Sequence, residues 1–217
     1  DRTIMKPDRK MVSPDLVAFR KPLLQRFNTT VRDGRESFSD QVYSPVKILY
    51  SYESVMLSEQ AYQAILGAEE ILLRNHVPYG LIPVRAGTPL NIPEDCELLI
   101  ACDQRCLDDS TIQTLIDYTV KGGKLIATGK TGEYDENYRQ RRQNLLSESL
   151  LKGSSGLFKA DNYPVKVSGS GWTISVREPV DGGRELMEDI ARLWEQPFTV
   201  KAPPTVFLEA RQSGEAI

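Results

Sequence analysis

Between residues 46 and 132 the chain alternates apolar segments of strand length with segments of helical periodicity, and this alternation constrains its fold more than any other feature. The expected order is strand (46–51), helix (58–75), strand (79–84), strand (96–103), helix (108–121) and strand (124–128). Strands that alternate with helices build βαβ units, in which a helix connects two parallel strands. The sequence therefore predicts a three-layer α/β/α sandwich with a mostly parallel sheet.

The two helices of this region carry recognisable start and stop signals. Ser58 precedes a run of helix-favouring residues, and apolar residues recur along that run at helical spacing. Asp108 opens the second helix, where the helix dipole favours an acidic residue, and Gly122 with Gly123 closes it. The sequence therefore predicts both helices.

Composition excludes several classes of function. The 217 residues are 40% hydrophobic, and no apolar run approaches the roughly 18 residues that a membrane span needs. The net charge of −3 offers no general attraction for nucleic acid or anionic lipid. We expect a soluble protein with neither a nucleic-acid nor a membrane partner. The chain shows no targeting segment, and its cellular location is unknown.

The regions on either side of the alternating segment are less regular. Before it, we expect a helix over 14–27 and a polar connector over 28–44. After it, we expect a helix over 145–151, a loop over 153–156, a strand over 172–176, a helix over 183–195 and a strand over 205–210. The strand at 172–176 and the helix that follows it would add a last βα unit to the same sheet.

Three cysteines lie within eleven residues, at Cys96, Cys102 and Cys106. An odd number in so short a window is no disulfide framework for a domain of this size. With His76 as the sole histidine, the spacing of a four-ligand zinc site is not met either. The sequence predicts no metal site and no cofactor.

Two further patterns have a functional and a structural interpretation. Gly129-Lys130-Thr131 invites comparison with a phosphate-binding loop, but Lys124 stands where that motif requires its first glycine, so a plain turn is favoured. Acidic residues also follow the expected strands and could gather as a carboxylate pair for glycosidic cleavage. They are Glu53, Asp103, Asp135 and Glu136. Solvated loop carboxylates are the simpler interpretation.

The segments 48–54, 98–101, 107–110 and 118–129 together resemble the trimerisation domain of TIM-barrel beta-galactosidases, which has a flavodoxin-like, class I glutamine amidotransferase-like fold. In that family a catalytic barrel precedes this domain and a small β-sandwich follows it. The resemblance implies three parts: residues 1–45 as the exit segment of a preceding domain, 46–200 as the amidotransferase-like domain, and 201–217 as a linker and the start of a β domain. It also implies that this domain contacts the barrel and the β domain of the parent chain, and that the chain forms a homotrimer.

Active amidotransferases of this fold carry a nucleophilic cysteine on a Gly-x-Cys-x-Gly turn, with a histidine and an acidic residue near the end of the chain. The matching turn here, residues 128–132, contains no cysteine, and His76 lies far upstream. We therefore expect no catalytic residue, but a non-catalytic structural and oligomerisation domain of a multidomain glycoside hydrolase. The alternative is a diverged cysteine hydrolase that uses Cys102 or Cys106 with His76. Sugar binding at the strand edge is permitted by the fold but supported by no residue pattern.

Overall fold

The computed structural model describes residues 41–152, 155–163, 165–168, 176–179, 183–204 and 211–212, with isolated positions at 21, 22, 25 and 29. The chain divides into two compact units, Asp1–Val42 with Arg211–Ile217, and Tyr43–Ala210. In the described part of the first unit, strand β1 (Gln41–Val42) pairs antiparallel with β9 (Arg211–Gln212). The predicted boundaries at 45 and 200 remain predictions.

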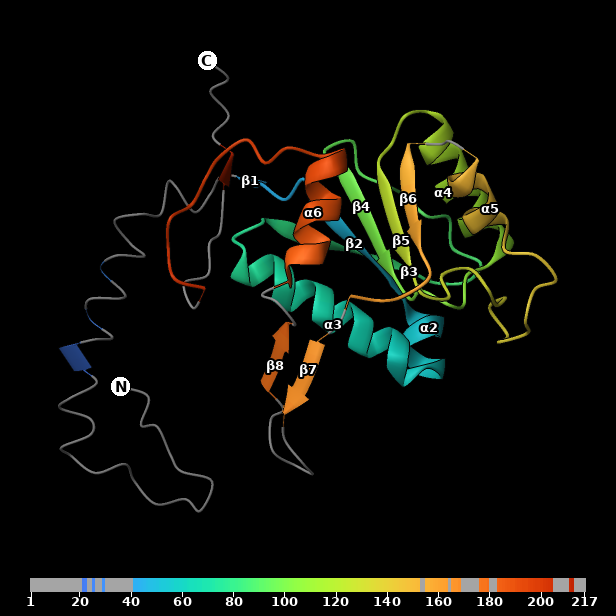
Figure 1. Ribbon diagram of the computed structural model, residues 1–217, viewed down its shortest axis with the longest axis horizontal. Helices are drawn as coiled ribbons and strands as arrows, with labels where there is room; N and C mark the ends of the chain where they lie inside the picture. The colour runs from blue at the N-terminus through green and yellow to red at the C-terminus, as the bar shows by residue number, and fades with distance from the viewer. Residues whose placement is uncertain are drawn as a thin grey trace. The chain divides into compact units, whose positions relative to one another are not determined.

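A five-stranded parallel sheet forms the centre of the second unit (Figure 1). Its strands are β2 (Val46–Ser51), β3 (Tyr79–Val84), β4 (Leu98–Cys102), β5 (Leu125–Thr128) and β6 (Gly156–Lys159). They lie in the order β3-β2-β4-β5-β6, and every neighbouring pair is parallel. Strands β4 and β5 are buried along their whole length, as expected where helices cover both faces of a sheet. The predicted parallel α/β fold is confirmed.

Helices cover both faces of this sheet and complete the three layers. Their bounds are α2 (Tyr52–Leu57), α3 (Glu59–Arg74), α4 (Asp109–Val120), α5 (Leu145–Leu151) and α6 (Arg184–Leu193). On one face, side chains of α3 and α6 such as Ile65 and Leu186 pack on Ile48 of the sheet. On the other face, Leu115 of α4 and Leu146 of α5 belong to a second core. Figure 1 shows α3 with α6 and α4 with α5 on opposite sides of the strands.

The residues expected to begin the two central helices cap them in the structure. The Ser58 hydroxyl accepts a hydrogen bond from the N–H of Ala61 at the start of α3. The Asp108 carboxylate accepts one from the N–H of Thr111 at the start of α4, at 2.8 Å. Each cap satisfies a backbone donor that the first helical turn leaves without a partner.

The last strand of the sheet differs from the sequence expectation. The fifth strand is β6, whereas Val176 begins β8 (Val176–Pro179), which pairs antiparallel with β7 (Val165–Ser168) as a separate two-stranded sheet. Strand β6 has only four residues and lies at the sheet edge with all of them half-buried, so its apolar pattern is weak. Gly156, the last residue of the predicted loop over 153–156, is instead the first residue of β6.

Other expected elements have different bounds in the structure or lie on residues that the structure does not describe. Residues 52–57, between the expected strand 46–51 and the expected helix 58–75, form the short helix α2, which Ser51 caps. The helix expected over 14–27 and the strand over 205–210 lie outside the described residues, apart from positions 21, 22 and 25, as do residues 172–175. In the part of the chain that the structure describes, no helix is long and apolar enough to cross a membrane.

Packing of α6 on α3 depends on a glycine. Gly183 precedes α6 with a φ of 79°, and a Cβ there would overlap the side chain of Ile71 on α3. Gly122 also has a positive φ, of 94°, but a Cβ there would meet nothing within 4 Å. The two glycines share a backbone requirement, and only Gly183 also has a packing requirement.

We expect Gly122→Ala to lower the free energy of unfolding by about 1–2 kcal/mol, from the left-handed backbone alone. Gly183→Ala should lower it by a further 1–3 kcal/mol or so, because α6 must shift from α3. Urea denaturation of both variants measures the difference. Equal losses would contradict close packing of α6 on α3 at this point.

Candidate functional site at the carboxyl edge of the sheet

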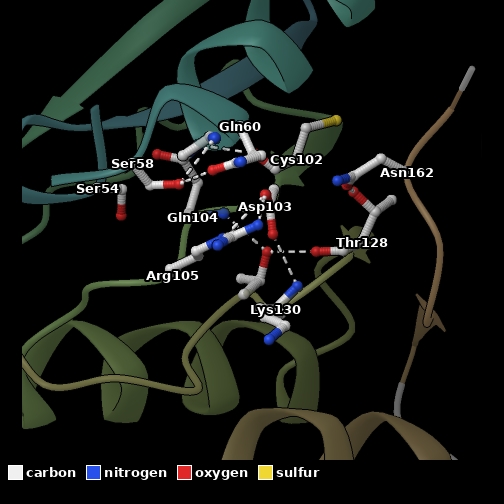
Figure 2. Close-up of polar contacts among 12 residues, drawn as sticks. Ser54, Ser58, Gln60, Cys102, Asp103, Gln104, Arg105, Thr128, Lys130 and Asn162 are labelled. Atoms are coloured by element: carbon white, nitrogen blue, oxygen red, sulfur yellow. Dashed lines mark hydrogen bonds and ion pairs between the residues drawn. The ribbon is translucent and has the colours of Figure 1, made fainter. Parts of the chain in front are cut away.

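The strand order of the sheet reverses between β2 and β4, so the loops beyond their carboxyl ends flank a topological switch point. Open parallel sheets bind ligands at such a point. The segments that follow β2, β4 and β5 begin at Tyr52, Asp103 and Gly129. Figure 2 shows polar side chains near these strand ends, among them Asp103, Gln104 and Lys130 of the candidate site.

Gln104 lies at the centre of this edge and is completely buried. Its side-chain oxygen accepts a hydrogen bond from the N–H of Ser51 at 2.7 Å, and its side-chain amide donates to the carbonyl of Cys102 at 2.7 Å. Its backbone N–H donates to the hydroxyl of Thr131 at 3.0 Å, and its carbonyl accepts from the N–H of Gly132 at 3.0 Å. One residue therefore connects the ends of β2 and β4 to the loop that follows β5.

Two serines continue the network on the β2 side. The hydroxyls of Ser51 and Ser54 donate to the carbonyl of Cys106, at 2.8 and 3.1 Å. The N–H of Cys106 donates to the Ser54 oxygen at 2.9 Å. Both serines are fully buried, so neither hydroxyl is available as a nucleophile.

Asp103 directly follows β4 in a left-handed conformation, with a φ of 51°. Its carboxylate is 1% exposed, forms an ion pair with Arg105 at 2.9 Å, and accepts a hydrogen bond from the N–H of Lys130 at 2.8 Å. A Cβ on Gly129 would lie 2.6 Å from an Asp103 carboxylate oxygen, so glycine is required where these loops meet. The anion that the Gly129 turn binds is thus the protein's own carboxylate.

This arrangement agrees with the interpretation of Gly129-Lys130-Thr131 as a plain turn. The Thr131 side chain is completely buried, and its hydroxyl lies within hydrogen-bonding distance of the carbonyls of Ala101 and Thr128. A phosphate-binding loop instead points its amides and its hydroxyl at the ligand.

None of the three thiols is in an environment that favours a thiolate. Burial raises the pKa of Cys102 to about 12. It raises those of Cys96 and Cys106 to about 11. For Cys106 the Arg105 guanidinium opposes this effect, and the carboxylates of Asp135 and Glu53 add to it. A reactive cysteine requires the opposite shift.

His76 lies at the other edge of the sheet from Cys102 and Cys106. It follows the last turn of α3 and precedes the amino end of β3, whereas Cys102 is the carboxyl-terminal residue of β4. It is buried, and its Nε2 lies 3.3 Å from the carbonyl oxygen of Pro203. The structure therefore does not bring the three residues of the alternative catalytic site together.

The other acidic residues singled out in the sequence are also engaged in hydrogen bonds within the protein. Glu53 accepts a hydrogen bond from the N–H of Ala86, and Asp135 accepts one from the N–H of Arg139. Glu136 accepts one from the side chain of Asn137. Their engagement supports structural roles. Among the described residues no group of three or more histidine, cysteine or acidic side chains could hold a metal ion.

Sequence reasoning missed the residues that organise this edge. Gln104 and Asn162 carry no motif, and Thr131 was noted only within the Gly129-Lys130-Thr131 pattern. The roles of all three come from contacts between residues 27 to 53 positions apart along the chain. The one available signal was position, since all three follow strands of the sheet closely.

Comparisons with known proteins place the fold among parts of larger chains. No family model matches the chain, and no curated protein matches it. Part of the fold matches GH42 beta-galactosidases of known structure. Gan42B, a GH42 beta-galactosidase from G. stearothermophilus, is 19% identical with a TM-score of 0.39, and the match covers 46% of this chain and 15% of that one.

Two further structures show a similar relationship. The beta-galactosidase from the psychrophilic Marinomonas ef1 is 16% identical with a TM-score of 0.46, over 64% of this chain and 22% of that one. The exo-carrageenase GH42 from Bacteroides ovatus is 16% identical with a TM-score of 0.47, over 69% of this chain and 18% of that one. In these three cases the match spans less than a quarter of the longer chain.

Gln104→Leu should destabilise the protein by about 2–4 kcal/mol, because it leaves the N–H of Ser51 and the carbonyl of Cys102 buried without partners. Gln140→Leu is the matched control, since the Gln140 side chain donates to Glu133 on the surface. The control should change stability by less than about 0.5 kcal/mol. Chemical denaturation compares the two, and equal effects would show that the buried network contributes little.

The raised thiol pKa values predict slow alkylation of the folded chain near neutral pH. With a pKa of about 11, Cys106 is a thiolate in only about one molecule in ten thousand at pH 7. Iodoacetamide labelling, followed by mass spectrometry, should be at least about 100-fold slower in the folded than in the urea-unfolded chain. Rapid labelling of Cys102 or Cys106 with an apparent pKa below 8 would favour the hydrolase alternative instead.

Proposed function

We propose that this chain is a non-catalytic structural domain of a multidomain glycoside hydrolase, which docks against other domains and promotes oligomer formation. The observation that carries the proposal is the closed polar network at the carboxyl edge. There the hydroxyls, the amide and the Asp103 carboxylate are all bonded to the protein itself. The sequence resemblance to the beta-galactosidase trimerisation domain supplies the expected context of barrel, β domain and trimer.

The surface of α2 supports a docking role. Met56 is 81% exposed, and Tyr52 and Leu57 are close to half exposed. Tyr62, at the start of α3, is 41% exposed. Exposed apolar side chains grouped on neighbouring short segments are typical of contact surfaces. Since α2 directly follows β2, this surface lies at the same edge as the closed network.

The enzyme alternative, a diverged cysteine hydrolase, has little support from the geometry. It needs a thiolate and a neighbouring base. The thiols of Cys102 and Cys106 have raised pKa values, and His76 lies at the opposite edge of the sheet. Turnover of a glutamine, ester or glycoside substrate by this chain alone would overturn the structural proposal.

If α2 forms the contact, Met56→Glu should shift the chain from an oligomer to a monomer, because burying an unpaired carboxylate opposes association. Val120→Glu is the matched control, since Val120 on α4 is 73% exposed. Light scattering after gel filtration measures both variants. A wild-type chain that stays monomeric at high concentration would contradict the oligomerisation role, and equal effects of both variants would contradict α2 as the contact.

A further inference from the structure

An open hollow of about 390 Å³ lies beside the closed network. Its walls come from the first turns of α3 and from the segment after β6, and the residues are Glu59, Gln60, Gln63, Ala64, Asn162 and Tyr163. We call it the α3 hollow. Its volume falls within the range of small-molecule sites.

Both walls of the α3 hollow are held by the fold. On one side, the Ser58 cap begins α3. On the other, the Asn162 side-chain oxygen accepts a hydrogen bond from the Thr128 hydroxyl at 2.7 Å. The Tyr163 hydroxyl donates to the buried carboxylate of Asp189 on α6 at 3.0 Å, and Tyr163 is only 6% exposed. The hollow is therefore preformed, which lowers the entropic cost of binding.

Two side-chain amides present donors at this site. The Gln60 oxygen accepts from the Ser58 hydroxyl at 3.2 Å, and the Asn162 oxygen accepts from Thr128. With both oxygens engaged, the two amino groups are the parts left to bind a ligand, since neither donates to another described residue. Figure 2 shows Gln60 and Asn162, which belong to different segments, with Cys102 between them in that view.

The remaining lining determines the charge of a suitable ligand. Glu59 adds an exposed carboxylate, which accepts hydrogen bonds and repels anions. The ammonium of Lys159, 5.2 Å from the centre of the Tyr163 ring, is paired with Glu185 and does not offset that charge. Ala64 and the Tyr163 ring supply apolar surface. A ligand should therefore be neutral, carry groups that both donate and accept, and have an apolar face.

We propose that the α3 hollow binds a neutral polyhydroxylated ligand of the size of a single hexose. Each hydroxyl can accept from an amide and donate to the Glu59 carboxylate, and the ring carbons can pack on Ala64 and Tyr163. This site is independent of the docking role, because none of its lining residues belongs to the exposed surface of α2.

The proposal can be tested by titrating the isotope-labelled chain with D-galactose, D-glucose and myo-inositol, and following the side-chain amide signals in two-dimensional NMR. At least one of these probes should give saturable shifts of the Gln60 and Asn162 amides in the millimolar range. Gln60→Ala should weaken binding by about 3–10-fold, as expected for one hydrogen bond. Ala64→Phe should abolish binding by filling the hollow.

Gln113→Ala is the matched control, since Gln113 lies in an early turn of α4 and bonds only to Asp117 among the described residues. It should leave the affinity unchanged. The absence of saturable shifts with all three probes, or an equal loss in Gln113→Ala, would overturn the proposal. So would binding of D-galacturonate or inorganic phosphate in preference to the neutral probes. None of these results depends on whether the chain forms an oligomer.

Discussion

The hydrogen bonds of Gln104 hold together the edge of the sheet at which a fold of this kind would place chemistry. Parallel strands are connected through helices, so their carboxyl ends have no hairpin turns to fix them. Here the buried side chain of Gln104 joins the end of β2 to the end of β4, and its backbone bonds to the loop after β5. The geometry of this edge therefore depends on one amide that is satisfied at both ends.

The same interactions engage the hydroxyls of Ser51 and Ser54 within the protein. A catalytic hydroxyl or thiol must face a cavity with a base within reach. Ser51 and Ser54 donate to a backbone carbonyl instead, and Cys102 is buried. Asp103 has the left-handed backbone conformation that often marks a functional residue. Its carboxylate, however, forms an ion pair with Arg105 and accepts a hydrogen bond from the N–H of Lys130. The hydrogen bond and the ion pair of this carboxylate, and not the backbone strain, stabilise the connection between the loops.

The sequence was sufficient for the elements with strong periodicity or long apolar runs. Strands β2 and β3 and helix α5 have the predicted bounds, and the caps at Ser58 and Asp108 were expected from residue type. Strand β6 was missed because an edge strand of four half-buried residues has little pattern. Gln104 could not be predicted, because its role depends on which strands become neighbours, and local sequence does not encode that order.

The α3 hollow differs from the network next to it in one physical respect. Within the network, donors and acceptors meet each other, so a ligand would have to break protein hydrogen bonds in order to bind. At the hollow, the side-chain oxygens of Gln60 and Asn162 accept hydrogen bonds, and their amino groups donate to no other described residue. A ligand could form hydrogen bonds there at little cost to the fold, because the Ser58 cap and the Thr128 contact would remain in place. If this edge has a binding function, the hollow is therefore a better location for it than the strand ends.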